Sequence, residues 1–130
     1  MRGELVLDAS AIINCVARGK AGELAECYTV ELAKYEIGNY LWKRARLRRD
    51  LDSAFAARAL DALLRLLENM RILQADLREA LELAVEEGIT FYDAAYLRAA
   101  IERGAALVTD DERLYEVAKR RAAVLRSAEL

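Results

Sequence analysis

Acidic residues occur in this sequence at places where carboxylates can carry chemistry. Asp8 directly follows the apolar run 4–7, and Asp110 and Asp111 directly follow the apolar run 105–109. In an open parallel sheet, ligands bind in a crevice outside the carboxyl ends of the strands. If both runs are strands, we expect these carboxylates to gather at one edge of the sheet.

Two further acids lie on predicted helices beside apolar side chains. Asp93 stands four residues before Leu97 and shares its helix face, and Glu36 shares a face with Tyr40. A buried carboxylate without a partner costs several kcal/mol or stays protonated. Since no cationic side chain is clearly assigned to either acid, a metal ion is the economical partner.

The other residue types restrict which metal this is. The chain of 130 residues contains no histidine, which excludes imidazole catalysis and zinc sites that use histidine. Cys15 and Cys27 are too far apart for a CxxC motif, and we interpret them as small buried side chains, with a disulfide as the alternative. Carboxylates alone favour Mg²⁺ or Mn²⁺, and such sites commonly act on phosphates.

The charge of the chain is nearly balanced, with 22 acids against 20 bases. Without Asp8, Glu36, Asp93 and Asp111, the remainder has 18 acids against 20 bases and is slightly basic. The densest basic run is 42–49, which contains Arg44, Arg46 and Arg49. Two interpretations stay open for this run: a contact to phosphates, or a solvated helix end that matches the helix dipole.

Strands and helices are predicted to alternate along the chain. Strands are expected at 4–7, 28–30, 71–74, 105–109 and 122–126, and helices at 9–16, 21–27, 31–49, 50–70, 77–88, 90–103 and 110–121. Such alternation favours βαβ units and a parallel sheet between two helical layers. We therefore predict one α/β/α sandwich domain over residues 1–130.

The start of the chain and its hydropathy predict where the protein acts. No stretch approaches the roughly 20 apolar residues of a membrane span, and residues 1–4 lead straight into a short apolar run rather than a signal peptide. We expect a cytoplasmic protein with no membrane partner.

Four motifs, taken in order, resemble the PIN domain family, and within it the VapC-type toxin ribonucleases of prokaryotic toxin-antitoxin pairs. The resemblance covers essentially the whole chain. The motifs are Leu7-Asp8-Ala9-Ser10, Tyr35-Glu36-Ile37-Gly38-Asn39, Thr90-Phe91-Tyr92-Asp93-Ala94 and Leu107-Val108-Thr109-Asp110-Asp111-Glu112-Arg113-Leu114.

The resemblance implies a role for each acid. Asp8, Glu36 and Asp93 correspond to the core metal ligands. Asp111 is preferred over Asp110 as the fourth, because the family places an acid two residues after the threonine. Supporting polar side chains are Ser10, Thr109 and Asn39.

The resemblance also implies a fold, an activity and partners. The family fold is a five-stranded parallel sheet of order 3-2-1-4-5, with the acids at the carboxyl ends of the strands. The implied activity is Mg²⁺- or Mn²⁺-dependent endonucleolytic cleavage of RNA by a homodimer. A VapB-type antitoxin silences it by placing its tail in the acidic groove.

Other interpretations fit part of this pattern. A catalytically inactive PIN-like module that binds RNA or another protein would keep most of the motifs. Every acid except Glu36 also has an explanation as a helix cap, including capping boxes at Thr90 to Asp93 and Thr109 to Glu112. A receiver domain is disfavoured because Leu73-Gln74 ends its strand without an acceptor Asp, and a haloacid dehalogenase phosphatase because Ser10 replaces the second Asp.

Overall fold

The strands form one parallel sheet. The computed structural model describes residues 3–130, so Met1 and Arg2, on which the signal-peptide prediction partly rests, lie outside the described residues. The five strands are β1 (Leu5–Leu7), β2 (Tyr28–Val30), β3 (Arg71–Leu73), β4 (Ala106–Val108) and β5 (Val124–Leu125). They lie in the order β3-β2-β1-β4-β5, and all neighbouring strands run parallel. The predicted fold class and strand order are confirmed.

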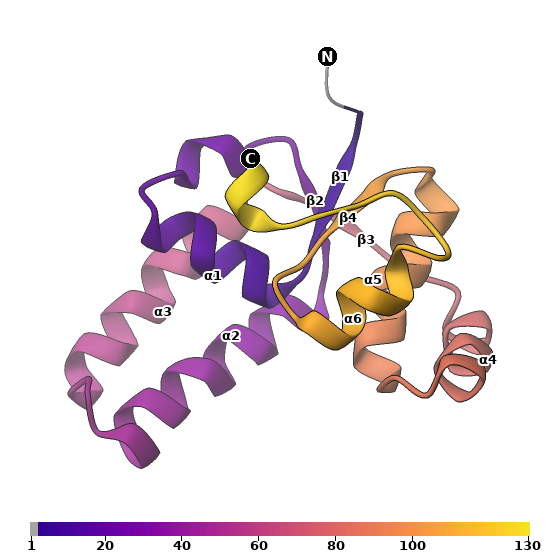
Figure 1. Ribbon diagram of the computed structural model, residues 1–130. Helices are drawn as coiled ribbons and strands as arrows, with labels where there is room; N and C mark the ends of the chain where they lie inside the picture. The colour runs from indigo at the N-terminus through magenta and orange to yellow at the C-terminus, as the bar shows by residue number, and fades with distance from the viewer. Residues whose placement is uncertain (1–2) are drawn as a thin grey trace.

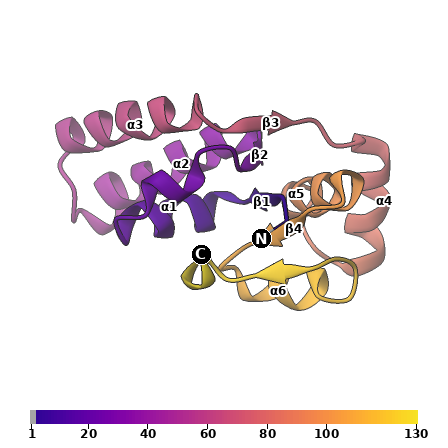
Figure 2. The ribbon, with the colours of Figure 1, turned by 90° about the horizontal axis from the view of Figure 1, so that it is seen from above.

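Helices cover both faces of this sheet. They are α1 (Ala9–Ala17), α2 (Leu32–Trp42), α3 (Ser53–Leu67), α4 (Leu77–Glu87), α5 (Phe91–Arg103) and α6 (Glu112–Ala118). Two short 3₁₀ helices, η1 (Ala21–Leu24) and η3 (Ser127–Glu129), and a π-helix, η2 (Lys43–Arg48), complete the chain. Helices α1, α2 and α3 lie on one side of the sheet and α4, α5 and α6 on the other (Figure 1 and Figure 2).

The central strands are buried on both faces. Every residue of β1 and β2 is buried, and Leu7, Ile12 and Tyr96 are among the largest fully buried side chains. A parallel sheet with helices on both sides requires strands that are apolar on both sides. This explains why the strands are continuous apolar runs in the sequence rather than alternating patterns.

The register of the central strands sets the position of the predicted acids. In the pair β1 and β4, Leu7 lies opposite Val108. The backbone N–H of Asp8 continues this pairing by donating to the carbonyl of Val108, at 3.1 Å. Asp8 and Thr109 therefore leave their strands side by side, at the carboxyl edge of the sheet.

The predicted helix 31–49 ends earlier as an α-helix than its sequence indicates. After Trp42 the chain continues as the π-helix η2, and Arg49 takes a left-handed conformation with φ 56°. The N–H of Arg49 bonds to the carbonyl of Arg44, five residues back, and π segments of this kind are frequent at functional sites. The sequence offers Asp50 and Asp52 as places for the break between these helices, and the structure uses Asp52, which is the N-cap of the helix that begins at Ser53.

Helix α4 has the predicted position, but its inner face differs from the one that the spacing of Leu77, Ala80, Leu81, Ala84 and Val85 predicts. Its buried residues are Ala80, Leu83 and Ala84, whereas Leu77, Leu81 and Val85 are exposed. The apolar positions of this helix form a stripe too broad for one contact, and the alanines allow closer packing against α5. Packing, which the sequence period does not determine, decides which half of the stripe is buried.

Two smaller predictions are also decided. Cys15 and Cys27 are buried thiols and not a disulfide, and the Cys27 thiol donates to the carbonyl of Glu23. Within residues 3–130, no helix has the length and apolar character needed to cross a membrane.

Candidate active site

Asp8 is the most buried of the predicted acids, with 5% of its surface exposed. One carboxylate oxygen accepts hydrogen bonds from the Ser10 hydroxyl, at 2.7 Å, and from the N–H of Ala11, at 2.9 Å. The other accepts from the hydroxyl of Thr109. Burial raises the pKa of Asp8, while these three hydrogen bonds oppose the rise. The two predicted hydroxyls, of Ser10 and Thr109, thus donate to the Asp8 carboxylate and fix its orientation.

Glu36 reaches the same region from α2. It is half-buried and accepts a hydrogen bond from the hydroxyl of Tyr96, at 2.6 Å. Burial raises the pKa of Glu36, the hydrogen bond from Tyr96 opposes this, and the charge of Asp8 raises it further. Burial and the Glu36 carboxylate also raise the pKa of Tyr96, which keeps the phenol a proton donor.

Asp93 lies in the first turn of α5, where the hydroxyl of Thr90 caps the helix by accepting its N–H at 3.0 Å. This confirms Thr90 as the predicted cap. Burial raises the pKa of Asp93 to about 6, together with the negative charges of Asp111, Asp8 and Glu36. A carboxyl group that responds to three other carboxylates lies near all three, so the four predicted acids share one region of the structure.

Asp111 belongs to this group through its charge on Asp93, although it is exposed. It is the N-cap of α6 and accepts the N–H of Leu114, at 2.8 Å. The predicted capping box that starts at Thr109 is wrong, because the helix begins at Glu112 and the hydroxyl of Thr109 instead donates to Asp8.

Asp110 faces a different part of the molecule. It accepts hydrogen bonds from the side chain of Asn14, at 2.7 Å, and from the N–H of Ser127, at 2.9 Å. Partial burial raises the pKa of Asp110, but the bonds from Asn14 and Ser127 and the charge of Arg18 outweigh it and leave the pKa below its usual value. Asp110 therefore ties η3 to α1, and Asp111 is the acid that approaches Asp93.

The donor set of the cluster is made of oxygen atoms. Among residues 3–130, no three Asp, Glu or Cys side chains converge tightly enough to form a ready metal site. Each carboxylate of the cluster turns instead to a neutral donor of the protein, such as the Tyr96 hydroxyl at Glu36 and the Thr90 hydroxyl at Asp93. Within the same described residues, no Lys or Arg forms an ion pair with any of the four acids. The chemistry of these donors fits a hard divalent cation.

A hollow of about 660 Å³ lies beside the cluster. Asn39 contributes to it, as do Lys43 and Arg48 from the π-helix η2. Of the predicted RNA-binding residues, Arg46 and Arg49 are exposed outside its lining, and Arg44 pairs with Asp50 at 3.0 Å. The residues that line the hollow are Leu32, Tyr35, Glu36, Asn39, Tyr40, Lys43, Arg48 and Tyr92.

The sequence analysis did not identify Tyr96, and within the basic run 42–49 it named Arg44, Arg46 and Arg49 rather than Lys43 and Arg48. Tyr96 stands three residues after Asp93 within an apolar helix face, so the sequence does indicate that it is buried near Asp93. A buried Tyr hydroxyl usually requires a hydrogen-bond partner. Lys43 follows Glu36 by seven residues, or two helical turns. Nothing in the sequence indicates the π-helix that carries Arg48 to the same hollow.

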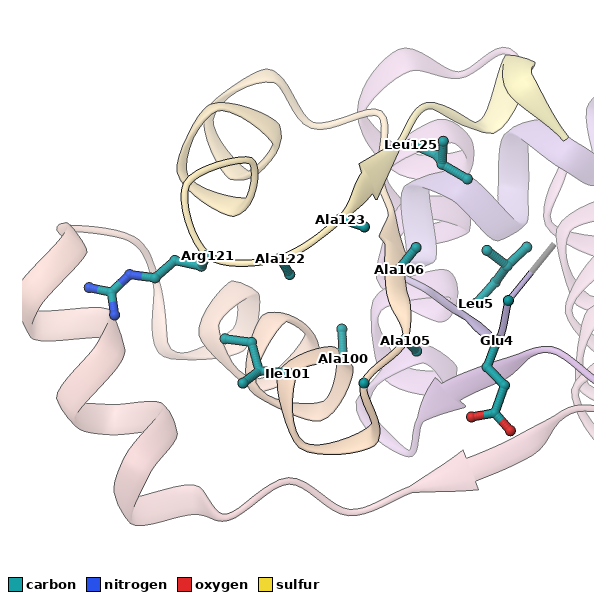
Figure 3. A pocket seen from close by; sticks show the side chains of 12 residues that line it. Glu4, Leu5, Ala100, Ile101, Ala105, Ala106, Arg121, Ala122, Ala123 and Leu125 are labelled. Carbon is teal, nitrogen blue, oxygen red and sulfur yellow. The ribbon is translucent and has the colours of Figure 1, made fainter.

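Another hollow, of about 480 Å³, lies at the amino ends of β1, β4 and β5. Ala100, Ala105 and Ala122 line it with other small or apolar side chains, and the charged ends of Glu4 and Arg121 point away from it (Figure 3). It contains no cluster of groups able to carry chemistry, so the carboxyl edge of the sheet is the candidate active site.

The PIN domain family matches residues 5–120 of the sequence. The chain belongs to the PIN domain family. This match includes all four acids of the cluster and four of the five strands, and it confirms the resemblance drawn from the motifs.

Two relatives of this PIN domain come from Pyrobaculum aerophilum. One is named Exonuclease VapC9 and is 44% identical over 114 residues, covering 85% of this chain and 83% of the relative. The other is named Ribonuclease VapC3 and is 36% identical over 123 residues, covering 87% and 93%. The solved structure of PAE2754 from the same organism superposes with a TM-score of 0.82 at 33% identity, over 99% of this PIN domain and 94% of that chain.

Proposed function

We propose that this protein is a divalent-metal-dependent ribonuclease and the toxin of a VapBC-type toxin-antitoxin pair. The observation that carries the proposal is the grouping of Asp8, Glu36, Asp93 and Asp111, none of which forms an ion pair with a Lys or Arg among residues 3–130. Two relatives that share more than a third of their residues with it bear VapC nuclease names. The proposed substrate is RNA, and the proposed reaction is hydrolysis of its phosphodiester bonds.

The carboxyl oxygens of these four acids would hold the cation, with Mg²⁺ or Mn²⁺ preferred because the site offers oxygen donors alone. When bound, such an ion activates water and neutralises the charge that grows on the scissile phosphate. Ser10 and Thr109 orient Asp8, and Tyr96 orients Glu36. One of the site carboxylates accepts the proton of the attacking water.

The remaining parts of the proposal follow the family. The proposed protein is a single domain over residues 1–130 that forms a homodimer in the cytoplasm. Its proposed partner is a VapB-type antitoxin whose tail enters the acidic groove. Arg44, Arg46 and Arg49 stay predicted as RNA contacts on the arm that α2, η2 and α3 form. The alternative is an inactive PIN-like module that binds RNA without cleaving it.

Cleavage assays with purified protein test the activity. We expect single-stranded or structured RNA to be cut with Mn²⁺ or Mg²⁺ and to stay intact with a chelator. Asp8→Asn and Asp93→Asn should each lower the rate by roughly 10²–10⁴-fold, the range for a lost acid-base group. The matched control is Asp61→Asn, on the exposed face of α3, which should cleave like the wild type. Equal rates for wild type, Asp8→Asn and Asp93→Asn would refute the assignment.

A separate substrate is needed to distinguish endonucleolytic from exonucleolytic cleavage, because the relatives bear both an exonuclease and a ribonuclease name. A circular RNA has no ends and is cut only by an endonuclease. We expect the circle to be opened, in agreement with the endonucleolytic activity that the resemblance implies. Degradation of the linear form alone would replace that part of the proposal with exonucleolytic cleavage.

A further inference from the structure

The 660 Å³ hollow beside the acids has the dimensions of a ligand site. Pockets for small ligands measure about 300–1,000 Å³, so a nucleotide fits within it. Glu36 belongs both to its lining and to the acid cluster. A nucleotide bound in the hollow would therefore lie next to a phosphate group bound at the acids.

Aromatic rings are the main apolar feature of this hollow. Tyr35 and Tyr92 are 72% and 57% exposed, and each immediately precedes an acid of the cluster in the sequence. Among residues 3–130, Leu32 is the one aliphatic side chain that lines the hollow. An amphipathic peptide helix binds by placing its apolar face in a hydrophobic groove, whereas two exposed rings beside polar groups match the stacking surfaces of proteins that bind single strands.

Cations lie at the end of the hollow that is farther along the arm. Lys43 and Arg48 line it, and within residues 3–130 neither forms an ion pair. Arg44, in contrast, pairs with Asp50 and places its guanidinium 5.8 Å from the ring centre of Tyr40. The hollow thus offers rings in its wall and two cations, of which Arg48 also lies near enough to Asp50 to lower the pKa of that carboxyl. This combination is complementary to a base and its phosphate.

We propose that this hollow binds an unpaired nucleotide of a single-stranded RNA, next to the phosphate that is cut. Its base stacks on Tyr35 or Tyr92, and its phosphate contacts Lys43 and Arg48. The inference rests on the proposed ribonuclease function and specifies its substrate as unpaired RNA, since a base inside a duplex is already stacked on its neighbours and cannot enter the hollow.

The test compares binding of RNA with and without bases. Fluorescence anisotropy is measured with Mg²⁺ in the Asp8→Asn background, using a labelled single-stranded RNA and the same backbone made abasic. Base stacking on an aromatic side chain contributes about 1–3 kcal/mol, so the intact RNA should bind at least about fivefold more tightly than the abasic one. In Tyr35→Leu combined with Tyr92→Leu, this ratio should fall to within about threefold of unity.

Control variants separate stacking from general damage. Tyr35→Phe with Tyr92→Phe keeps the rings and should keep the ratio, as should Phe55→Leu, which removes an exposed ring outside the hollow. Lys43→Gln with Arg48→Gln should flatten the salt dependence of binding by about 1.4 in logarithmic slope, since each contact to a single strand contributes about 0.7. That pair should leave the ratio between intact and abasic RNA unchanged.

Binding and cleavage fail separately in this design. An unchanged ratio in the double leucine variant, or equal binding of a duplex, would overturn the nucleotide site and leave the hollow to a protein partner. If the ratio between intact and abasic RNA falls in the double leucine variant but the wild-type protein cuts no RNA, the nucleotide site stands and the nuclease function is refuted.

Discussion

Acids lie at both ends of the sheet, but the groups that donate hydrogen bonds to them differ: arginine at the amino end and neutral groups at the carboxyl end. At the amino end, Glu4 accepts two hydrogen bonds from Arg103, at 2.7 and 2.9 Å, which lower its pKa. The same guanidinium lies 4.8 Å from the ring centre of Tyr28, and that of Arg71 lies 5.7 Å from it. The charge of Glu4 is thus satisfied by the protein itself.

At the carboxyl end, neutral groups take the place of arginine. Asp8 accepts from two hydroxyls and a backbone N–H, and Glu36 accepts from a phenol. Burial raises the pKa of Asp8, Glu36 and Asp93. The contrast supports the proposal that the charge at this end is arranged for a ligand, because the fold has arginines available and uses them elsewhere.

The largest expected difference between the two ends is in their response to a divalent ion. We expect Mn²⁺ at about 100 times its dissociation constant to stabilise the wild type by about 2.7 kcal/mol, or roughly 5–10 °C in melting temperature. Asp93→Asn should remove most of this shift because it removes a donor of the cluster. Scanning calorimetry measures the shift without reference to activity.

Glu4→Gln is the control at the amino end and should keep the full shift with Mn²⁺. An equal loss of the shift in Glu4→Gln and Asp93→Asn would mean that the ion binds to the surface in general. The distinction between the two ends would then fail.

The second expected difference is in pH dependence, measured with chelator. Asp93 has a pKa of about 6 in the folded protein against 3.8 for the unfolded reference, so the folded state binds this proton more tightly. Its contribution to stability therefore grows as the pH falls from about 6 towards 4. The rise corresponds to at most about 3 kcal/mol, and solvent screening of this half-buried group reduces the gain to roughly 1–2 kcal/mol.

Glu4 should act in the opposite direction. Its pKa is lowered by Arg103, so its contribution is present above pH 4.5 and is lost as the pH falls through the lowered value. Melting temperatures of wild type and Asp93→Asn, measured between pH 7 and 4.5, isolate the first effect. If the melting temperatures of wild type and Asp93→Asn changed equally with pH, the pKa of Asp93 in the folded protein would not be raised.

The sequence was sufficient for the carboxyl end because its acids follow strands. Asp8 and Asp111 occur just after apolar runs, and parallel strands place such positions at one edge of the sheet. Glu36 and Asp93 were found from their apolar helix faces, which pack towards the same place. The roles of these residues as metal ligands stay a prediction.

The amino end and the arm were not predictable in the same way. Glu4, Arg71 and Arg103 are far apart in the sequence and meet only through strand register and the packing of α5 on the sheet, so their approach has no local signal. The π-helix depends on one extra residue in a turn, which periodicity does not resolve. The exposed stripe of α4 shows the same limit, because two helix faces of similar hydropathy compete for one contact.

The smallest expected effect is also the most direct comparison of the two ends. With chelator at pH 7, Glu36→Gln should raise the melting temperature by up to a few degrees, because it removes a half-buried charge that Asp8 repels while its amide oxygen still accepts the Tyr96 hydroxyl. Glu4→Gln should lower the melting temperature, because it leaves the Arg103 guanidinium without its carboxylate. A marked loss of stability in Glu36→Gln would mean that this carboxylate supports the fold as Glu4 does, and the two ends would then differ only in the donors they use.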